Sequence, residues 1–147
     1  MIPPKLRALL EMFDMFPDVA DRTAMLLSYA DQFREVPADV ATRPFSSRHQ
    51  VPQCESDAYV WGVKAPDDTL QLYFAVENPS GVSAKALAAI LDKTLSGTPA
   101  REIAAVGPEI VERIFRQNIS MGKGMGLMSM VQAVQALAKA ASGPPAP

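Results

Sequence analysis

Residues 70–76, Leu-Gln-Leu-Tyr-Phe-Ala-Val, alternate large apolar side chains with Gln, Tyr and Ala. This period of two is typical of a strand that buries one of its faces. The Pro-Asp-Asp sequence of residues 66–68 is a turn signal, so residues 58–63 are the expected antiparallel partner in a hairpin. Residues 48–51 are predicted to form a third, shorter strand that ends at Pro52.

Before the hairpin, apolar residues recur at helical spacing. Residues 6–13 and 19–33 place apolar side chains three or four positions apart, which predicts two amphipathic helices. Asp18 or Asp21 is expected to cap the second helix, where a carboxylate favours the positive end of the helix dipole. Residues 34–44 contain two prolines and no clear period, so we expect a loop there.

After the hairpin, helical spacing returns. Ser83 is expected to cap a helix that ends at Gly97, and its predicted buried residues are Leu87, Ile90, Leu91 and Leu95. Thr98-Pro99 is typical of a cap followed by a first-turn proline, which predicts a short helix. Residues 110–115 form another apolar face, and the glycine-rich run 122–126 is expected to interrupt the chain. The predicted buried residues of the last helix are Leu127, Met130, Val131, Val134, Leu137 and Ala138.

This order of elements predicts an α+β fold, with a small three-stranded antiparallel sheet and helices packed on one face. The length of 147 residues and the hydrophobic content of 48% fit one domain, which we expect over residues 1–141. Residues 142–147 are rich in Gly and Pro and are expected to be a flexible tail.

Composition excludes several classes of function. A net charge of −2 does not favour nucleic acid as a partner. The single cysteine forbids an intrachain disulfide and favours a reducing, cytoplasmic location. No run approaches the roughly 18 apolar residues of a membrane span. Glu11 and Asp14 interrupt the apolar N-terminal run, so we expect no signal peptide. One cysteine and one histidine fall short of the roughly four ligands of a structural metal site, so none is expected.

The only histidine, cysteine and tryptophan of the chain all lie within residues 49–61. Cys54 has two interpretations. Free cysteine commonly acts as a small buried hydrophobe, and that is the simpler one. However, Pro52 comes just before it, and its other neighbours Gln53, Glu55, Ser56 and Asp57 are polar. These neighbours indicate a turn in which a reactive thiol can be reached.

His49 lies five residues before Cys54, and an imidazole can accept the proton of a nucleophilic thiol. A histidine at a strand edge or on the surface is the more ordinary interpretation. Glu55 and Asp57 act in the opposite direction, because nearby anions disfavour a thiolate. We therefore expect a thiol that waits for a reaction partner rather than one that is strongly activated.

Two features near the C-terminus raise the question of a binding site, and only the second remains a candidate. The Gly-Lys-Gly-Met-Gly run at 122–126 does not match a phosphate-binding loop, which has Ser or Thr after the lysine and follows a strand. Four of the eight methionines lie at 121, 125, 128 and 130. They either fill gaps in the core or offer an adaptable surface to a protein partner.

Residues 51–60, Val-Pro-Gln-Cys-Glu-Ser-Asp-Ala-Tyr-Val, place a Cys-x-Ser element directly before a strand. In this the thiol segment resembles the SufE family of sulfur acceptors. Residues 123–130 match a second element, in which a basic residue precedes Gly-Leu-x-x-Met at the last helix. Together with the order of elements, the resemblance covers about residues 5–140. Gln53 replaces the usual glycine, and Lys123 replaces the usual arginine.

The resemblance implies a sulfur acceptor and activator of a PLP-dependent cysteine desulfurase. Cys54 would carry sulfur as a persulfide and pass it to an iron–sulfur scaffold. PLP would belong to the desulfurase, so this chain would hold no cofactor. Lys123 would favour the anionic sulfur, and residues 51–57 would shelter the thiol and open to receive sulfur.

Three alternatives stay open at this point. An iron–sulfur cluster scaffold would need about three cysteine ligands and is disfavoured by the single cysteine. A thiol hydrolase would use Cys54 with His49 as base. A protein-binding module without enzymatic activity would carry Cys54 incidentally.

Overall fold

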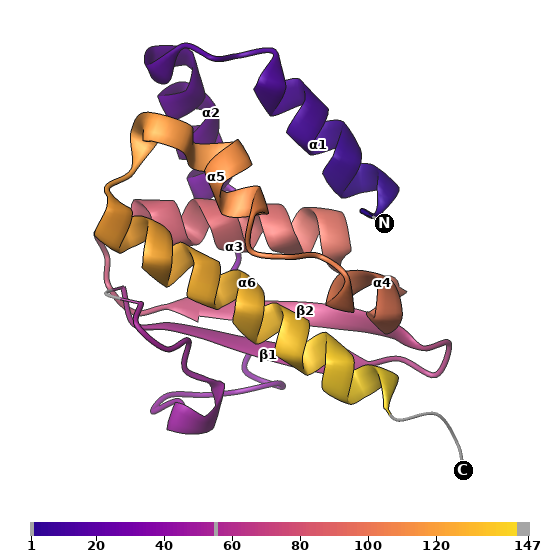
Figure 1. Cartoon of the computed structure of the whole chain (residues 1–147). Helices are drawn as coiled ribbons and strands as arrows, with labels where there is room; N and C mark the ends of the chain where they lie inside the picture. The colour runs from indigo at the N-terminus through magenta and orange to yellow at the C-terminus, as the bar shows by residue number, and fades with distance from the viewer. Residues whose placement is uncertain (1, 55, 144–147) are drawn as a thin grey trace.

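A computed structural model describes residues 2–54 and 56–143 of the chain. Figure 1 shows its elements. The longer helices are α1 (Pro4–Asp14), α2 (Val19–Asp31), α3 (Val82–Leu95) and α6 (Met121–Ser142). The short helices are η1 (Ser47–His49), α4 (Ala100–Ala104), α5 (Ile110–Phe115) and η2 (Arg116–Asn118). The strands are β1 (Ala58–Lys64), β2 (Thr69–Val76) and β3 (Thr98–Pro99). Of the tail expected at 142–147, residues 144–147 lie outside the described residues.

The strands form one antiparallel sheet in the order β1-β2-β3. The hairpin has the predicted partners, with Ala58 opposite Val76 and Lys64 opposite Leu70. α6 packs against β1 and α3 packs against β2, on the face that carries the main hydrophobic core (Figure 1). The prediction of an α+β fold with helices on one face of a three-stranded sheet is therefore confirmed.

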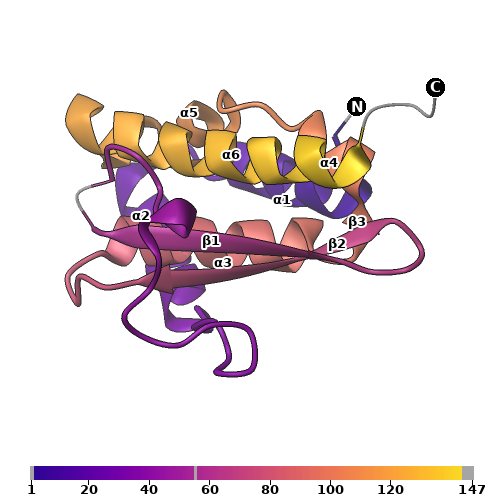
Figure 2. The same cartoon turned by 90° about the horizontal axis from the view of Figure 1, so that it is seen from below.

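The opposite face of the hairpin carries a second, smaller cluster, which we call the outer cluster. Its buried members are Val36, Trp61 and Ala75. Phe45 and Tyr59 pack against it, and the loop after α2 passes over this side of the hairpin (Figure 2). Because successive strand residues point to opposite faces, β1 contributes to both clusters.

The third strand is not where the sequence predicted it. Residues 48–51 contain the end of η1 and a single bridge between Gln50 and Tyr59. The third strand is instead β3, which pairs with the start of β2. Gly97, at φ 85°, turns the chain after α3, and its amide donates to the carbonyl of Leu70. This turn aligns Thr98-Pro99 with β2, so the proline ends a strand before α4 begins.

Two helix starts also differ from prediction. Ser83 lies in the first turn of α3, because Gly81 occupies the cap position. The glycine run 122–126 lies inside α6 rather than before it. Ser120 caps α6 by accepting a hydrogen bond from the amide of Lys123. Each glycine costs the helix about 1 kcal/mol relative to alanine, but the later turns of α6 bury an apolar face that offsets this cost.

The buried faces of α1, α3, α5 and α6 agree with the sequence, whereas in α2 Val19 and Leu27 are 49% and 48% exposed. Asp18 caps α2 by accepting from the amides of Ala20 and Asp21. The predicted apolar residues of α1, α3 and α5 are buried. All those predicted for α6 are also buried, apart from Leu137, which is half-buried.

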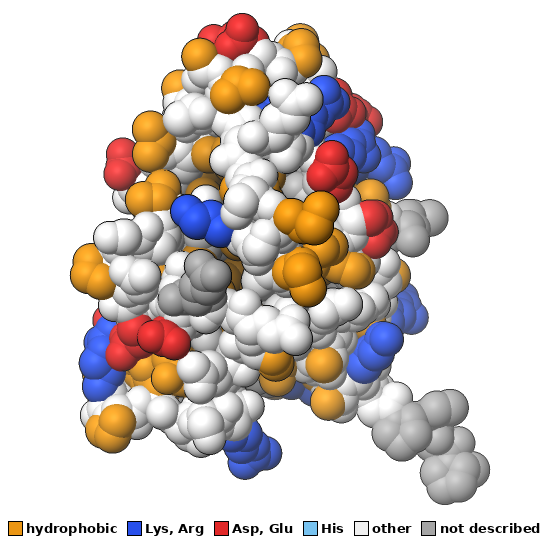
Figure 3. Space-filling model, turned by 60° about the vertical axis from the view of Figure 1, so that its left-hand side comes forward, with side chains coloured by type: hydrophobic (Ala, Val, Ile, Leu, Met, Phe, Trp, Pro, Cys, Tyr) orange, Lys and Arg blue, Asp and Glu red, His pale blue; other side chains and the backbone are white. Residues whose placement is uncertain are grey.

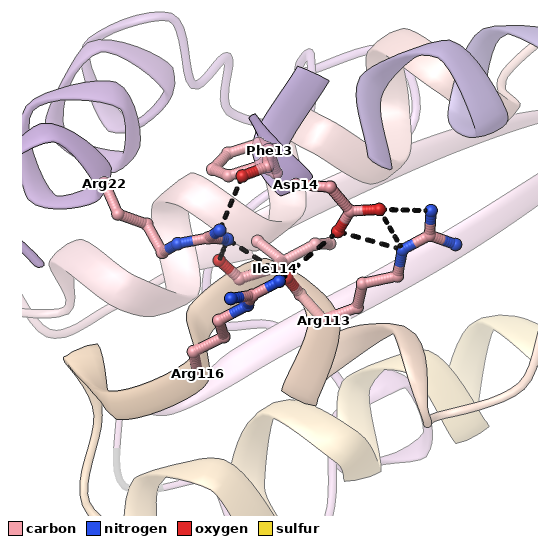
Figure 4. A network of polar contacts seen from close by, with 6 residues as sticks. All are labelled: Phe13, Asp14, Arg22, Arg113, Ile114 and Arg116. Carbon is pink, nitrogen blue, oxygen red and sulfur yellow. Dashed lines mark hydrogen bonds and ion pairs between the residues drawn. The ribbon is translucent and has the colours of Figure 1, made fainter. Parts of the chain in front are cut away.

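A buried arginine joins α1, α2 and α5 (Figure 4). Arg22 of α2 has no exposed surface and donates to the carbonyl of Phe13 at 2.5 Å and of Ile114 at 2.7 Å. It also donates to the carbonyl of Arg113 at 3.0 Å. These carbonyls lie at the ends of α1 and α5, where intrahelical donors are lacking. Arg22 therefore ties two helix C-termini to α2.

Candidate functional site

The thiol loop, residues 51–54, 56 and 57, precedes β1 and carries the single cysteine. Glu55, which we expected to disfavour the thiolate, lies outside the described residues. The side chain of Val51 is buried, and its amide donates to the carbonyl of Ala58 at 2.8 Å. Gln53 adopts φ 60°, in the left-handed region. Cys54 is partly buried against the main core. A bend closes when the amide of Asp57 donates to the carbonyl of Cys54 at 3.2 Å.

The end of the thiol loop is anchored to the segment between β2 and α3. The amide of Glu77 donates to the carbonyl of Asp57, and the amide of Asn78 donates to the carbonyl of Ser56, both at 3.1 Å. Ser56 also lies close to Gly81, where an added Cβ atom would approach the Ser56 side chain to 2.9 Å. This half of the loop is thus fixed by backbone hydrogen bonds and by close packing.

A pocket of about 170 Å³ lies between the thiol loop and the starts of α3 and α6. Its lining residues are Gln53, Cys54, Ser56, Asn78, Ser80, Gly81, Val82, Ser83, Ala84, Gly122, Lys123, Gly126 and Leu127. The starts of β1, α3 and α6 lie together at the left edge of Figure 1. Figure 3 brings this side forward and shows hydrophobic side chains scattered among uncharged polar surface.

The electrostatics of the pocket favour an anion. The amino ends of α3 and α6 carry partial positive charge because their first amides lack intrahelical acceptors. Among the described lining residues, Lys123 is the only one with a charged side chain. It is exposed at the pocket rim, in the first turn of α6. Cys54 and Lys123 thus share a pocket, although they are far apart in sequence.

His49 is placed differently from the expected catalytic base. Its ring stacks on Trp61, with centroids 5.3 Å apart and planes 30° apart. Trp61 belongs to the outer cluster, whereas Cys54 packs against the main core on the other face. Among the described residues, no hydrogen bond joins His49 to Cys54. The structure therefore places Lys123 on the same pocket as the thiol and leaves His49 with the aromatic side chains.

The outer side of the thiol loop is open. Ser47, Gln50, Val51, Pro52, Gln53 and Cys54 line a surface hollow of about 580 Å³ there. Pro52 and Gln53 are exposed. The loop thus contacts α6 and also borders open space that no residue of α6 lines.

Several residues of the site were missed by the sequence analysis. Gly126 lies under the loop, where an added Cβ atom would be 3.0 Å from the carbonyl oxygen of Gln53 and 3.4 Å from the Cα of Cys54. Gly126 was visible only as part of the glycine-rich run 122–126 and of the Gly-Leu element. Nothing in the sequence pattern placed Asn78, Ser80 and Gly81 at the site. Their closeness to the thiol depends on the chain returning to the start of β1.

The described residues contain neither a candidate metal site nor a candidate membrane span. No group of three or more His, Cys, Asp or Glu side chains has a metal-binding arrangement there. In the same part of the chain, no helix is both long enough and apolar enough to cross a membrane.

The fold and the site define a class of small α+β domain that presents one cysteine from the loop leading into its sheet. Within that class, the chain belongs to the SufE family, because the family model described as "SufE: Fe-S metabolism associated domain" matches residues 7–138. Membership of this family supports a role in iron–sulfur metabolism.

Known proteins agree with this assignment. The chain is 27% identical over 135 residues to "SufE-like protein 1, chloroplastic/mitochondrial" of Arabidopsis thaliana. The match covers 91% of this chain but only 34% of that protein, so the chain spans about a third of its relative's length. A solution structure of a hypothetical protein from Thermus thermophilus matches with a TM-score of 0.74 and 25% identity. That match covers 98% of this chain and 100% of the other.

Proposed function

We propose that this protein accepts sulfur on Cys54 from a PLP-dependent cysteine desulfurase, activates that enzyme and delivers the sulfur to an iron–sulfur scaffold. The observation that carries the proposal is the position of the only cysteine, partly buried in a small pocket between two helix amino ends. Family membership supports the same pathway. PLP is proposed to belong to the desulfurase, and this chain to need no cofactor of its own.

The transfer requires a single thiol on each protein. The Cys54 thiolate attacks the outer sulfur of a cysteine persulfide on the desulfurase, in a step like thiol–disulfide exchange. A sulfur–sulfur bond to Cys54 forms while the bond to the donor cysteine breaks. The donor thiolate leaves with the electron pair and takes up a proton. The transferred sulfur keeps its oxidation state, so no oxidant or reductant is consumed.

The pocket suits the product of this step. A persulfide is more exposed to attack by small thiols when it is open to solvent, and Cys54 is partly sheltered. The helix amino ends and the Lys123 ammonium favour an anionic sulfur. The room in the pocket, about 170 Å³, accommodates one added sulfur atom.

Exposed apolar side chains near the pocket support a protein as sulfur donor. Met121 and Met125 of α6 are 86% and 51% exposed, and Val82 at the start of α3 is 40% exposed. Methionine adapts well to the surface of a partner. Of the two expected roles for the methionines, contact fits Met121 and Met125, whereas Met130 is buried in the core.

The thiol hydrolase is the weaker alternative, because His49 stacks on Trp61 in the outer cluster rather than lying beside the thiol. A binding module with an incidental cysteine would keep its partner function after Cys54→Ala, and this distinguishes it from a sulfur carrier.

The direct test is incubation with a cysteine desulfurase, PLP and cysteine, followed by intact mass measurement. We expect the wild-type chain to gain one sulfur atom on Cys54 and Cys54→Ser to gain none. Cysteine turnover by the desulfurase should rise with wild type and not with Cys54→Ser. An unmodified wild-type mass beside a desulfurase that is turning over would falsify the proposal.

Lys123→Ala is expected to slow sulfur acceptance several-fold, because the ammonium at the pocket rim no longer favours anionic sulfur. The matched control is Lys139→Ala, an exposed lysine in the last turn of the same helix. Both variants should unfold at the wild-type temperature. Equal rates for the two variants would show that Lys123 gives no electrostatic support.

A further inference from the structure

The thiol loop is held differently at its two ends. Ser56 and Asp57 are fixed by hydrogen bonds to the amides of Asn78 and Glu77. Gln53 and Cys54 meet α6 by packing, and among the described residues no hydrogen bond joins these two to α6. What keeps the cysteine close to α6 is therefore the fit between the loop backbone and the helix surface.

That fit depends on the missing side chain of Gly126. The residue is buried in α6, one turn after Gly122. An added Cβ atom would lie 3.0 Å from the Gln53 carbonyl oxygen and 3.4 Å from the Cα of Cys54. The nearest atoms are backbone atoms, so no side-chain rotation can make room. The loop itself would have to give way, by a few tenths of an ångström.

The direction of that movement is set by the surroundings. α6 packs against Gln53 and Cys54, whereas the open hollow of about 580 Å³ is lined by Ser47 and by residues 50–54 and by no residue of α6. Ser56 and Asp57 stay attached to residues 77 and 78, so the displacement falls on Gln53 and Cys54. Moving these residues away from α6 carries the thiol toward solvent.

We propose that Gly126 is a positioning residue, whose lack of a side chain lets the loop lie on α6 and sets how deeply Cys54 is sheltered. The proposal rests on the sulfur-acceptor role of Cys54 for its biological meaning. Its consequence for thiol accessibility does not depend on that role, so the two can fail separately.

The test compares Gly126→Ala with Gly124→Ala. Gly124 is also buried in the first turns of α6, but its added Cβ atom would meet only the end of the Ile119 side chain, at an ordinary 3.4 Å. Both changes favour the helix equally, because alanine is the better helix former. Only Gly126→Ala pushes against the thiol loop.

The readout is the rate at which a bulky maleimide alkylates Cys54, followed by intact mass without any desulfurase. We expect Gly126→Ala to react several-fold faster than wild type, and Gly124→Ala to react at the wild-type rate. Thermal unfolding of both variants checks that the fold is kept. Equal alkylation rates for the two variants, or a slower rate for Gly126→Ala, would overturn the proposal.

A double variant ties the effect to the contact with Gln53. In Gln53→Gly/Gly126→Ala, glycine allows the carbonyl at 53 to rotate away from the new methyl group without lifting the loop. Its alkylation rate should return toward that of Gln53→Gly alone. If Gly126→Ala does not fold by itself, folding of the double variant supports the contact, and failure of both contradicts it.

The consequence for sulfur transfer is measured separately. Once loaded with sulfur, Gly126→Ala should lose it to a small thiol such as dithiothreitol several-fold faster than Gly124→Ala. If no variant is loaded, the sulfur-acceptor function fails while the alkylation result still decides the role of Gly126. If all are loaded and lose sulfur equally, Gly126 does not protect the persulfide.

Discussion

At the scale of single residues, the sequence located Cys54 and Lys123 but could not relate them to His49. Nearness in sequence suggested a thiol–imidazole pair, yet β1 separates the two, since Cys54 packs on its helix side and His49 on Trp61. Residues that alternate along a strand point to opposite faces, and this decides which neighbours meet. The pairing of Cys54 with Lys123 was accessible only through the resemblance, because the chain between them forms most of the fold.

Gln53 is the residue where local preference and structure conflict. Its φ of 60° lies in the left-handed region, which costs a non-glycine residue about 1–2 kcal/mol. Gln53→Gly should therefore be about 1 kcal/mol more stable than Gln53→Ala, because alanine keeps the strain and glycine removes it. Part of the strain relief is offset by the greater freedom of glycine in the unfolded chain.

The measurement is urea unfolding of both variants and wild type. The side chain of Gln53 is exposed, so its loss in either variant has little effect of its own. Equal unfolding free energies for the glycine and alanine variants would mean that position 53 bears no strain.

At the scale of elements, periodicity predicted the helices and the hairpin well, because each buries a regular face that repeats in the sequence. It failed for β3, which is only two residues long and has no period to detect. It also failed for the start of α6, since glycines signal a break unless a cap and a packed face stabilise the helix. Ser120 and the later apolar turns provide both.

The Arg22 network is an element-scale feature that periodicity could not reveal. Arg22→Met should reduce the free energy of unfolding by about 2–4 kcal/mol, because three backbone carbonyls lose a charged donor. Burial is the main cause that lowers the pKa of the Arg22 guanidinium, and the nearby positive charge of Arg116 lowers it further. The folded protein therefore holds the charge of Arg22 at some energetic cost. Methionine keeps most of the length of the side chain and no donor.

The control is Arg101→Met, an exposed arginine of α4. Chemical unfolding should show little change for this variant. If Arg22→Met is as stable as Arg101→Met, the network contributes no net stability, as happens when an apolar residue replaces a buried charge without penalty.

At the scale of the whole molecule, ion pairs join segments among the helices and on the opposite side of the hairpin. Among the helices, Arg113 of α5 donates to Asp14 of α1 at 2.7 Å (Figure 4). On the other side, Arg43 of the loop after α2 donates to both Glu35 and Glu77. The Asp14–Arg113 and Arg43–Glu77 pairs connect segments far apart in sequence, so their loss should loosen the molecule as a whole, whereas Arg43 and Glu35 belong to the same loop.

The pKa values of these carboxyl groups predict the response to acid. A hydrogen bond from Arg113 lowers the pKa of Asp14 below its ordinary 3.8, and one from Arg43 lowers the pKa of Glu35 below its ordinary 4.5. A depressed pKa stabilises the folded state fully above the ordinary value. That contribution is lost as pH falls through the lower, folded-state pKa. Both carboxylates are partly exposed, so salt and water screen the effect.

We therefore expect the thermal midpoint to stay level from neutral pH down to the ordinary pKa values and then to fall. Asp14→Asn should have a lower midpoint at neutral pH, and the difference from wild type should shrink as Asp14 itself becomes protonated. The control is Asp39→Asn, an exposed residue outside the ion pairs of the described chain. A constant difference between Asp14→Asn and wild type down to pH values below both carboxyl pKa values would mean that the Asp14–Arg113 pair does not control acid stability.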